Sequence, residues 1–199
     1  PRAPVAMILH PHPQGGGTMN EQITQRLYKT FVNRGFATLR FNFRGVGRSQ
    51  GVYDNGEGEL SDAATAMDWL QSQNPASTQC WIAGFSFGSW IGMQLMMRRP
   101  EIRGFISISP PAITHDFTFL APCPASGLIV NGEEDTTVPP EAVDKLVERV
   151  SIQKGVSIDV DIVPGANHFF TDHLDQMVER VSSYLDDALT EDAPEPLFE

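Results

Sequence analysis

Residues 80–90 read CWIAGFSFGSW, an apolar run that passes through Gly84, Ser86 and Gly88 into a second apolar segment. The run before Gly84 has the composition of a buried strand, and the residues after Gly88 have the pattern of a helix. A strand that leads directly into a helix must turn sharply, and flanking glycines remove the side chains that would collide there. The Ser86 hydroxyl would then project above the end of the strand, as a nucleophile. A turn that serves packing alone is the alternative.

The same alternation of apolar runs and helical segments continues along the chain. Strands are predicted at 5–9, 36–43, 80–84, 104–108, 127–130 and 157–163, and helices at 19–33, 59–73, 87–99, 140–150 and 173–189. Several strands are apolar throughout, which is typical of parallel strands buried on both faces. The sequence therefore predicts an α/β fold with a mostly parallel, doubly wound sheet and helices on both faces. We expect a single domain over 1–189 and an acidic, disordered tail over 190–199.

The composition describes a soluble globular chain whose partners are not polyanions. Of the 199 residues 41% are hydrophobic, and the formal net charge of −11 disfavours nucleic acid and anionic membranes as partners. No apolar run reaches the roughly 20 residues that span a bilayer. Cys80 and Cys123 lie in or beside apolar runs, which indicates buried free thiols and favours a reducing compartment, the cytoplasm. The chain begins at Pro1, so an upstream segment is expected and a targeting signal stays open.

A serine nucleophile needs a histidine base, and the base needs an acid that orients it. Asp135 and His168 each lie about five residues past a predicted strand, in the segments LIVNGEEDTTVPP and VDIVPGANHFF. The carboxyl ends of parallel strands meet at one edge of a sheet, so Ser86, Asp135 and His168 should project from the same edge. Spacing alone also allows Glu134 as the acid. The alternative without a catalytic role is that residues 133–135 form a solvated acidic turn and that His168 is a structural histidine.

The first predicted strand ends in LHPHP, residues 9–13. A backbone N–H at this edge could stabilise an oxyanion, and because proline has no N–H, His12 is the expected donor. The second donor is the N–H of Phe87, at the positive end of the helix that follows the serine. The alternative is a metal site formed by His10 and His12, but no Asp, Glu or Cys beside them completes a ligand set. We therefore expect neither a metal ion nor a cofactor.

Together these motifs resemble an α/β-hydrolase, whose signature is the Gly-x-Ser-x-Gly turn. The resemblance covers nearly the whole chain and is carried by LHPHP, FRGVGRSQG, GFSFG, GEEDTTVP and GANHFF. The chain is similar to the small lidless serine hydrolases grouped with dienelactone hydrolase-like and acyl-peptidase-like proteins. A serine stands where dienelactone hydrolases carry cysteine, which counts against that particular activity. The family's sheet usually starts with an antiparallel hairpin, which we expect to precede the first strand of this chain.

The resemblance implies a serine hydrolase that cleaves a small soluble carboxylic ester or thioester through an acyl-enzyme on Ser86. In that mechanism Asp135 and His168 complete the catalytic triad, and the N–H groups of His12 and Phe87 form the oxyanion hole. An amide or peptide hydrolase with the same triad is one alternative, and a catalytically silent binding protein of the same fold is another. The expected partner is a small-molecule acyl substrate, with no nucleic acid and no membrane. The sequence leaves the oligomeric state open, a homodimer included.

Overall fold

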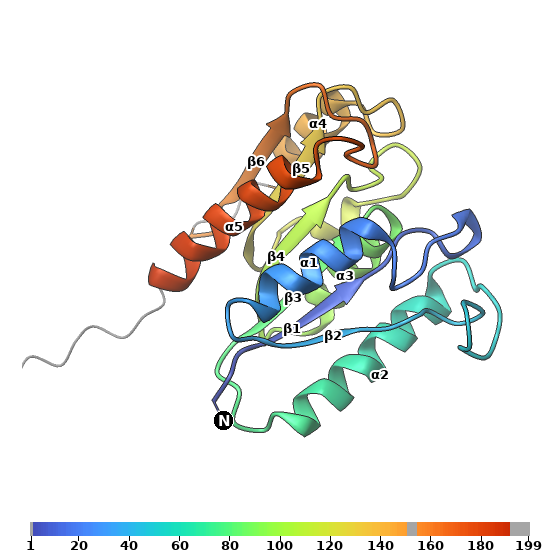
Figure 1. The fold of residues 1–199 in the computed structure, drawn as a ribbon, viewed down its shortest axis with the longest axis vertical. Helices are drawn as coiled ribbons and strands as arrows, with labels where there is room; N and C mark the ends of the chain where they lie inside the picture. Colours follow the sequence, from blue (N-terminus) through green and yellow to red (C-terminus); the bar gives the residue numbers. More distant parts are fainter. Residues whose placement is uncertain (1, 151–154, 192–199) are drawn as a thin grey trace, which may run out of the picture.

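The computed structural model describes residues 2–150 and 155–191. Its centre is one sheet in which the strands follow the order β2-β1-β3-β4-β5-β6, and every strand pair is parallel (Figure 1). The α/β fold with a parallel sheet is therefore confirmed. The strands are β1 (Val5–Leu9), β2 (Ala37–Arg40), β3 (Cys80–Phe85), β4 (Ile102–Ile108), β5 (Ser126–Gly132) and β6 (Ile158–Val163).

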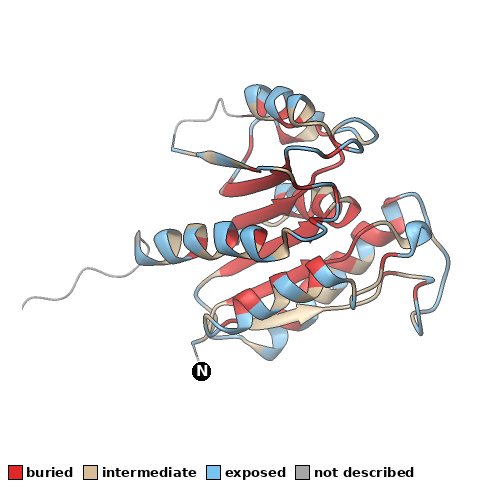
Figure 2. Ribbon diagram, turned by 45° about the horizontal axis from the view of Figure 1, so that its top comes forward, coloured by how far each residue is buried: buried red, intermediate tan, exposed pale blue. Residues whose placement is uncertain are grey.

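Helices cover both faces of this sheet. Helices α1 (Gln22–Val32) and α5 (Leu174–Glu191) pack on one face, and α2 (Glu57–Gln73), α3 (Phe87–Arg98) and α4 (Pro140–Val150) pack on the other. Two short 3₁₀ helices, η1 (Pro13–Gly15) and η2 (Thr118–Leu120), lie in the connecting loops. The inner strands are buried on both faces and the edge strands β2 and β6 are only partly buried (Figure 2). This pattern explains why β1 and β3 are apolar at every position.

The predicted strands and helices agree with the structure to within three residues at each end, and β2 is shorter than predicted. The sequence favours a strand over 36–43, whereas β2 ends at Arg40. The chain leaves the sheet there because the Phe43 N–H donates to the side chain of His10, at 3.1 Å, rather than to a neighbouring strand. Farther on, the Arg44 guanidinium donates two hydrogen bonds to the Asp62 carboxylate, at 2.8 and 3.0 Å. These contacts position the segment 41–56 near the end of β1.

Three further expectations concern the cysteines, the chain end and membranes. Cys80 and Cys123 are buried free thiols, as predicted. Helix α5 continues to Glu191, and the rest of the predicted tail, 192–199, lies outside the described residues. Within the described ranges, no helix is both long and apolar enough to span a bilayer.

Candidate active site

Ser86 lies at the turn between β3 and α3, in a backbone conformation that L residues rarely adopt. Its φ and ψ angles are 52° and −117°, which strains a residue that carries a side chain. The Ser86 N–H donates to Ile108 O at 2.8 Å, and the Ser89 N–H donates to Ser86 O at 2.9 Å. Ser86 is half-buried. The sheet and the helix therefore hold the strained serine between them, which is the geometry of a nucleophile elbow.

The two glycines of the elbow are required by close backbone contacts. A Cβ atom on Gly84 would lie 2.4 Å from the carbonyl carbon of Gly88. A Cβ atom on Gly88 would lie 2.2 Å from Leu9 O, at the end of β1. Any side chain at position 88 would therefore push α3 away from β1. This is the steric reason that the sequence suggests for both glycines.

Asp135 and His168 are in direct contact although 33 positions separate them in the chain. The distance from His168 Nδ1 to Asp135 Oδ2 is 2.8 Å. The second carboxylate oxygen accepts the N–H groups of Thr137, at 2.8 Å, and Val138, at 2.7 Å. The Asp135 side chain is fully buried, and that of His168 is 11% exposed. Because an ionised carboxylate only accepts hydrogen bonds, Nδ1 of His168 carries a proton, and in the neutral imidazole Nε2 then keeps its lone pair.

The loops that carry the acid and the histidine are joined to each other. The Glu134 N–H donates to Ala166 O at 2.9 Å, and the Glu133 carboxylate accepts a backbone N–H of the histidine loop at 2.9 Å. Glu134 is exposed, whereas Asp135 is buried against the imidazole. Of the acids that the sequence left open, the structure therefore places Asp135, and not Glu134, against His168.

Ser86 meets this pair at the same edge of the sheet without being hydrogen-bonded to it. The ring of Phe85, the residue before the serine, lies 5.3 Å from the His168 ring. Ser109, which directly follows β4, donates its hydroxyl to His168 O at 3.3 Å. Within the described part of the chain, the Ser86 hydroxyl makes no hydrogen bond to His168. Catalytic contacts of this type are often long until a substrate binds.

The two N–H groups expected to form the oxyanion hole are both available. Neither the His12 N–H nor the Phe87 N–H donates to any residue in 2–150 or 155–191. Phe87 is the first residue of α3, where N–H groups have no partner within the helix. The rings of these two residues lie 5.0 Å apart. The two residues that carry the expected donors are therefore neighbours in the fold.

His10 is a buried neutral histidine that holds the loop after β1. Because the Phe43 N–H donates to its Nε2, that nitrogen carries no proton, and Nδ1 donates to Pro11 O at 2.7 Å. Burial lowers the pKa of His10 to about 4. The Pro11 carbonyl and the His12 N–H belong to one trans peptide and point in opposite directions. The hydrogen bond from His10 therefore also orients the His12 N–H.

The His12 ring has hydrogen-bond partners that differ from those of His10. His12 Nδ1 accepts the Gln14 N–H at 3.1 Å, and its Nε2 lies 3.3 Å from Tyr53 Oη. No cluster of three side chains suited to a metal ion occurs among the described residues. The arrangement therefore offers no support for the H-x-H alternative.

Two further side chains, which belong neither to the predicted triad nor to the predicted oxyanion hole, lie beside the elbow. The Tyr53 ring is 5.1 Å from the His12 ring and 6.1 Å from the Phe87 ring. The His115 ring is 4.5 Å from the Trp90 ring and 6.1 Å from the Phe87 ring. Both residues come from long loops that follow strands β2 and β4, and such loops commonly carry binding residues. That position is the one signal by which the sequence could have indicated them.

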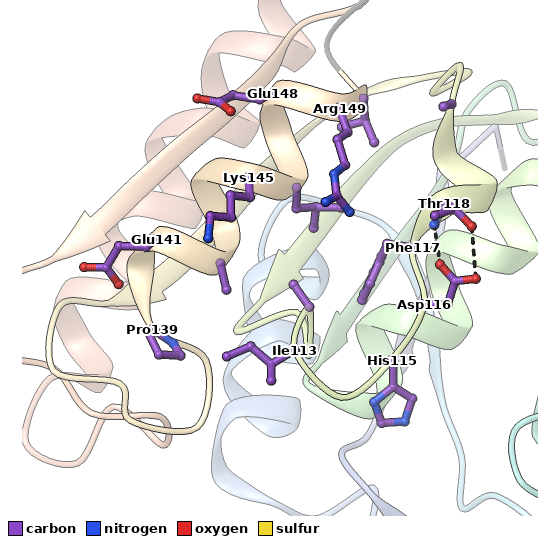
Figure 3. A pocket seen from close by; sticks show the side chains of 15 residues that line it. Ile113, His115, Asp116, Phe117, Thr118, Pro139, Glu141, Lys145, Glu148 and Arg149 are labelled. Atoms are coloured by element: carbon purple, nitrogen blue, oxygen red, sulfur yellow. Dashed lines mark hydrogen bonds between the residues drawn. The ribbon is translucent and has the colours of Figure 1, made fainter.

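A cavity of about 840 Å³ adjoins this region without containing the predicted catalytic residues. It lies between α4 and the segment 112–121 (Figure 3). Figure 3 shows Arg149 extending from α4 into the space beside Phe117, with His115 at the other end. His115 connects the cavity to the elbow because its ring also packs on Trp90.

Comparisons with known proteins show the family to which the chain belongs. Residues 1–120 match the family model of X-Pro dipeptidyl-peptidases (S15 family). The chain belongs to this family, within the α/β-hydrolase superfamily. An uncharacterized protein of Rickettsia prowazekii is 49% identical over 189 residues, which are 93% of this chain and 79% of that protein.

Solved structures show the same relationship. A candidate α/β hydrolase of unknown function from Agrobacterium tumefaciens matches with a TM-score of 0.94 and 58% identity, over 98% of this chain and 90% of the other. An α/β serine hydrolase without a lid from Xanthomonas campestris matches with a TM-score of 0.84 and 31% identity, over 94% and 84%. The resemblance stated from the sequence is therefore confirmed, and the chain is a serine hydrolase of the α/β fold.

Proposed function

We propose that this serine hydrolase is a carboxylesterase that cleaves small soluble esters or thioesters through an acyl-enzyme on Ser86. The observation that carries the proposal is the buried Asp135–His168 pair beside the strained serine. In the proposed reaction Ser86 Oγ attacks the carbonyl carbon while His168 Nε2 takes the hydroxyl proton. The tetrahedral intermediate collapses, and the departing alcohol or thiol takes that proton from His168. A water molecule then repeats the two steps and releases the acid.

The electrostatics of the site support these roles. The Asp135 carboxylate is held by two backbone N–H groups and the imidazole, so it can stabilise the imidazolium that forms when Ser86 loses its proton. The free N–H groups of His12 and Phe87 are suited to the oxyanion of the tetrahedral intermediate. No step requires a group beyond these five residues and water.

An amide or peptide hydrolase is the second candidate because of the family to which the chain belongs. Cleavage of a dipeptide from a free N-terminus requires a group that binds the substrate ammonium, commonly a carboxylate. Glu59 is a buried acid that is close enough to His12 and Tyr53 for its charge to act on both side chains. Both of its oxygens already accept backbone N–H groups, from Asp54 at 2.9 Å and Gly56 at 2.8 Å. Glu59 is also fully buried, so it is not placed to receive a substrate ammonium group, and we therefore put esters first.

A labelling experiment tests the nucleophile. A fluorophosphonate probe should label the wild-type protein and Ser61→Ala, which changes an exposed serine on α2, but not Ser86→Ala. Hydrolysis of p-nitrophenyl acetate should fall at least about 10³-fold in Ser86→Ala and stay unchanged in Ser61→Ala. A wild-type protein that neither reacts with the probe nor hydrolyses the ester would instead indicate the silent binding protein.

The substrate class is tested with matched acyl compounds. The purified protein is given p-nitrophenyl acetate, an S-acetyl thioester and an X-Pro p-nitroanilide under the same conditions. The ester or the thioester should have the highest kcat/KM. A higher kcat/KM for the p-nitroanilide would replace the esterase by the peptidase while leaving the Ser86 nucleophile in place.

A further inference from the structure

Tyr53 has a hydroxyl group whose role the reaction above does not explain. It belongs to the loop between β2 and α2, and its Oη lies 3.3 Å from His12 Nε2. Its ring packs beside His12 and Phe87, the two residues whose N–H groups form the proposed oxyanion hole. Tyr53 is only partly buried, so a bound substrate could reach it.

The tautomer of His12 decides which partner donates in this contact. The Gln14 N–H donates to His12 Nδ1 at 3.1 Å. A backbone N–H is only a donor, so Nδ1 carries a lone pair and no proton. Burial lowers the pKa of His12, and a neutral imidazole has its single proton on the other nitrogen. Nε2–H is therefore the donor and Tyr53 Oη is the acceptor.

This assignment leaves the hydroxyl hydrogen of Tyr53 without an acceptor among the described residues. His12 cannot accept it, because the nitrogen that faces Tyr53 is already protonated. No other acceptor for this hydrogen occurs in the ranges that the structure describes. Burial, followed by the charge of Glu59, raises the pKa of Tyr53, so the hydroxyl keeps its proton at neutral pH. His12 and Gln14 thus orient Tyr53 as a hydrogen-bond donor beside the elbow.

We propose that Tyr53 donates a hydrogen bond to a second oxygen of the substrate, separate from the scissile carbonyl oxygen. The inference rests on the proposed esterase function and refines its substrate class. It assigns the site to esters that carry an ether, hydroxyl or carbonyl oxygen near the reacting group, in preference to plain alkyl esters. His12 acts through Tyr53 in this respect and is a positioning residue for it, in addition to its backbone role.

The test compares substrates in which one oxygen replaces one methylene. The acyl pair is p-nitrophenyl methoxyacetate and p-nitrophenyl butyrate, and the alcohol pair is 2-methoxyethyl butyrate and butyl butyrate. In each pair the quantity measured is the ratio of kcat/KM for the ether to kcat/KM for the alkyl ester. The intrinsic reactivity of the substrates cancels when this ratio is compared between wild type and variant.

In Tyr53→Phe, the ratio should fall about fivefold in at least one pair, because one neutral hydrogen bond is lost. Tyr28→Phe is the matched control, since Tyr28 lies on α1 and its ring is covered by Arg40; this variant should keep both ratios. If Tyr53→Phe is active and both ratios are unchanged, the proposal is wrong. This holds even if kcat/KM falls equally for the ether and for the alkyl ester. A wild-type protein that hydrolyses none of the four esters refutes the esterase function, and this inference with it.

A second measurement does not depend on activity. Nitrogen-15 NMR of the wild-type protein, with His12 assigned by its loss in His12→Gln, reports which ring nitrogen is protonated. The expected result is a protonated Nε2 and an unprotonated Nδ1. A protonated Nδ1 would mean that Tyr53 donates to His12, and the proposal would be wrong even if the protein is an esterase.

Discussion

Replacing His10 with glutamine should change the way in which stability depends on pH. The wild-type imidazole is fully buried and has a pKa of about 4, whereas an unfolded chain has a histidine pKa of about 6.5. The pKa is thus lower in the folded state, so below pH 6.5 the unfolded state binds a proton that the folded state does not. Protonation therefore favours unfolding, and the wild-type protein loses stability as the pH falls from about 6.5 to about 4.

The magnitude follows from the shift of the pKa. A difference of about 2.5 pKa units corresponds to about 3 kcal/mol over the whole interval, of which about 2 kcal/mol is lost by pH 5. Glutamine can still accept the Phe43 N–H but has no titrating group. The variant is expected to be less stable at pH 7.5 by about 1–3 kcal/mol, because Pro11 O loses its donor. The stability difference between wild type and variant should then shrink by about 2 kcal/mol between pH 7.5 and pH 5.

Urea unfolding followed by tryptophan fluorescence at pH 7.5, 6.5, 5.5 and 5 measures this difference. Burial also lowers the pKa values of His12 and His115, but both proteins retain these histidines, so their contributions cancel in the comparison. Equal losses of stability in wild type and His10→Gln between pH 7.5 and pH 5 would refute the assignment of His10 as a buried neutral histidine.

Two further predictions concern the catalytic residues. Asp135→Asn should lower kcat for ester hydrolysis by about 10³- to 10⁴-fold, because the amide stabilises the wrong tautomer of His168. Glu134→Gln is the control, and an equal loss of kcat in that variant would count against Asp135 as the acid. Ser86→Gly should be more stable than Ser86→Ala by about 1 kcal/mol or more, because glycine relieves the strain at φ 52°. Thermal unfolding of the two inactive variants measures the second effect, and equal melting temperatures would show that the elbow stores no strain.

Several features of the site follow from sequence patterns that extend over only a few residues. The elbow is such a case: strand, glycine, serine, glycine and helix are adjacent in the chain, and the steric need for Gly84 and Gly88 can be deduced from that order. The alternation of strands and helices also predicts that Asp135 and His168 end up at the edge where Ser86 lies. Parallel strands require this, whatever the details of packing.

Other features depend on contacts between segments that are far apart in the chain. The spacing of 133–135 does not distinguish Glu134 from Asp135, because the choice is made by the imidazole of a loop 33 positions away. The end of β2 at Arg40 is likewise decided by His10, whose ring replaces a neighbouring strand as the acceptor for Phe43.

The sequence by itself therefore determined the order of strands and helices, the parallel sheet and the nucleophile turn, because periodicity and glycine sterics act between chain neighbours. The tertiary structure alone decided which acid meets His168, which ring nitrogen carries the proton in His10, His12 and His168, and that Tyr53 lies beside the elbow. These choices depend on hydrogen bonds whose partners become neighbours only when the chain has folded.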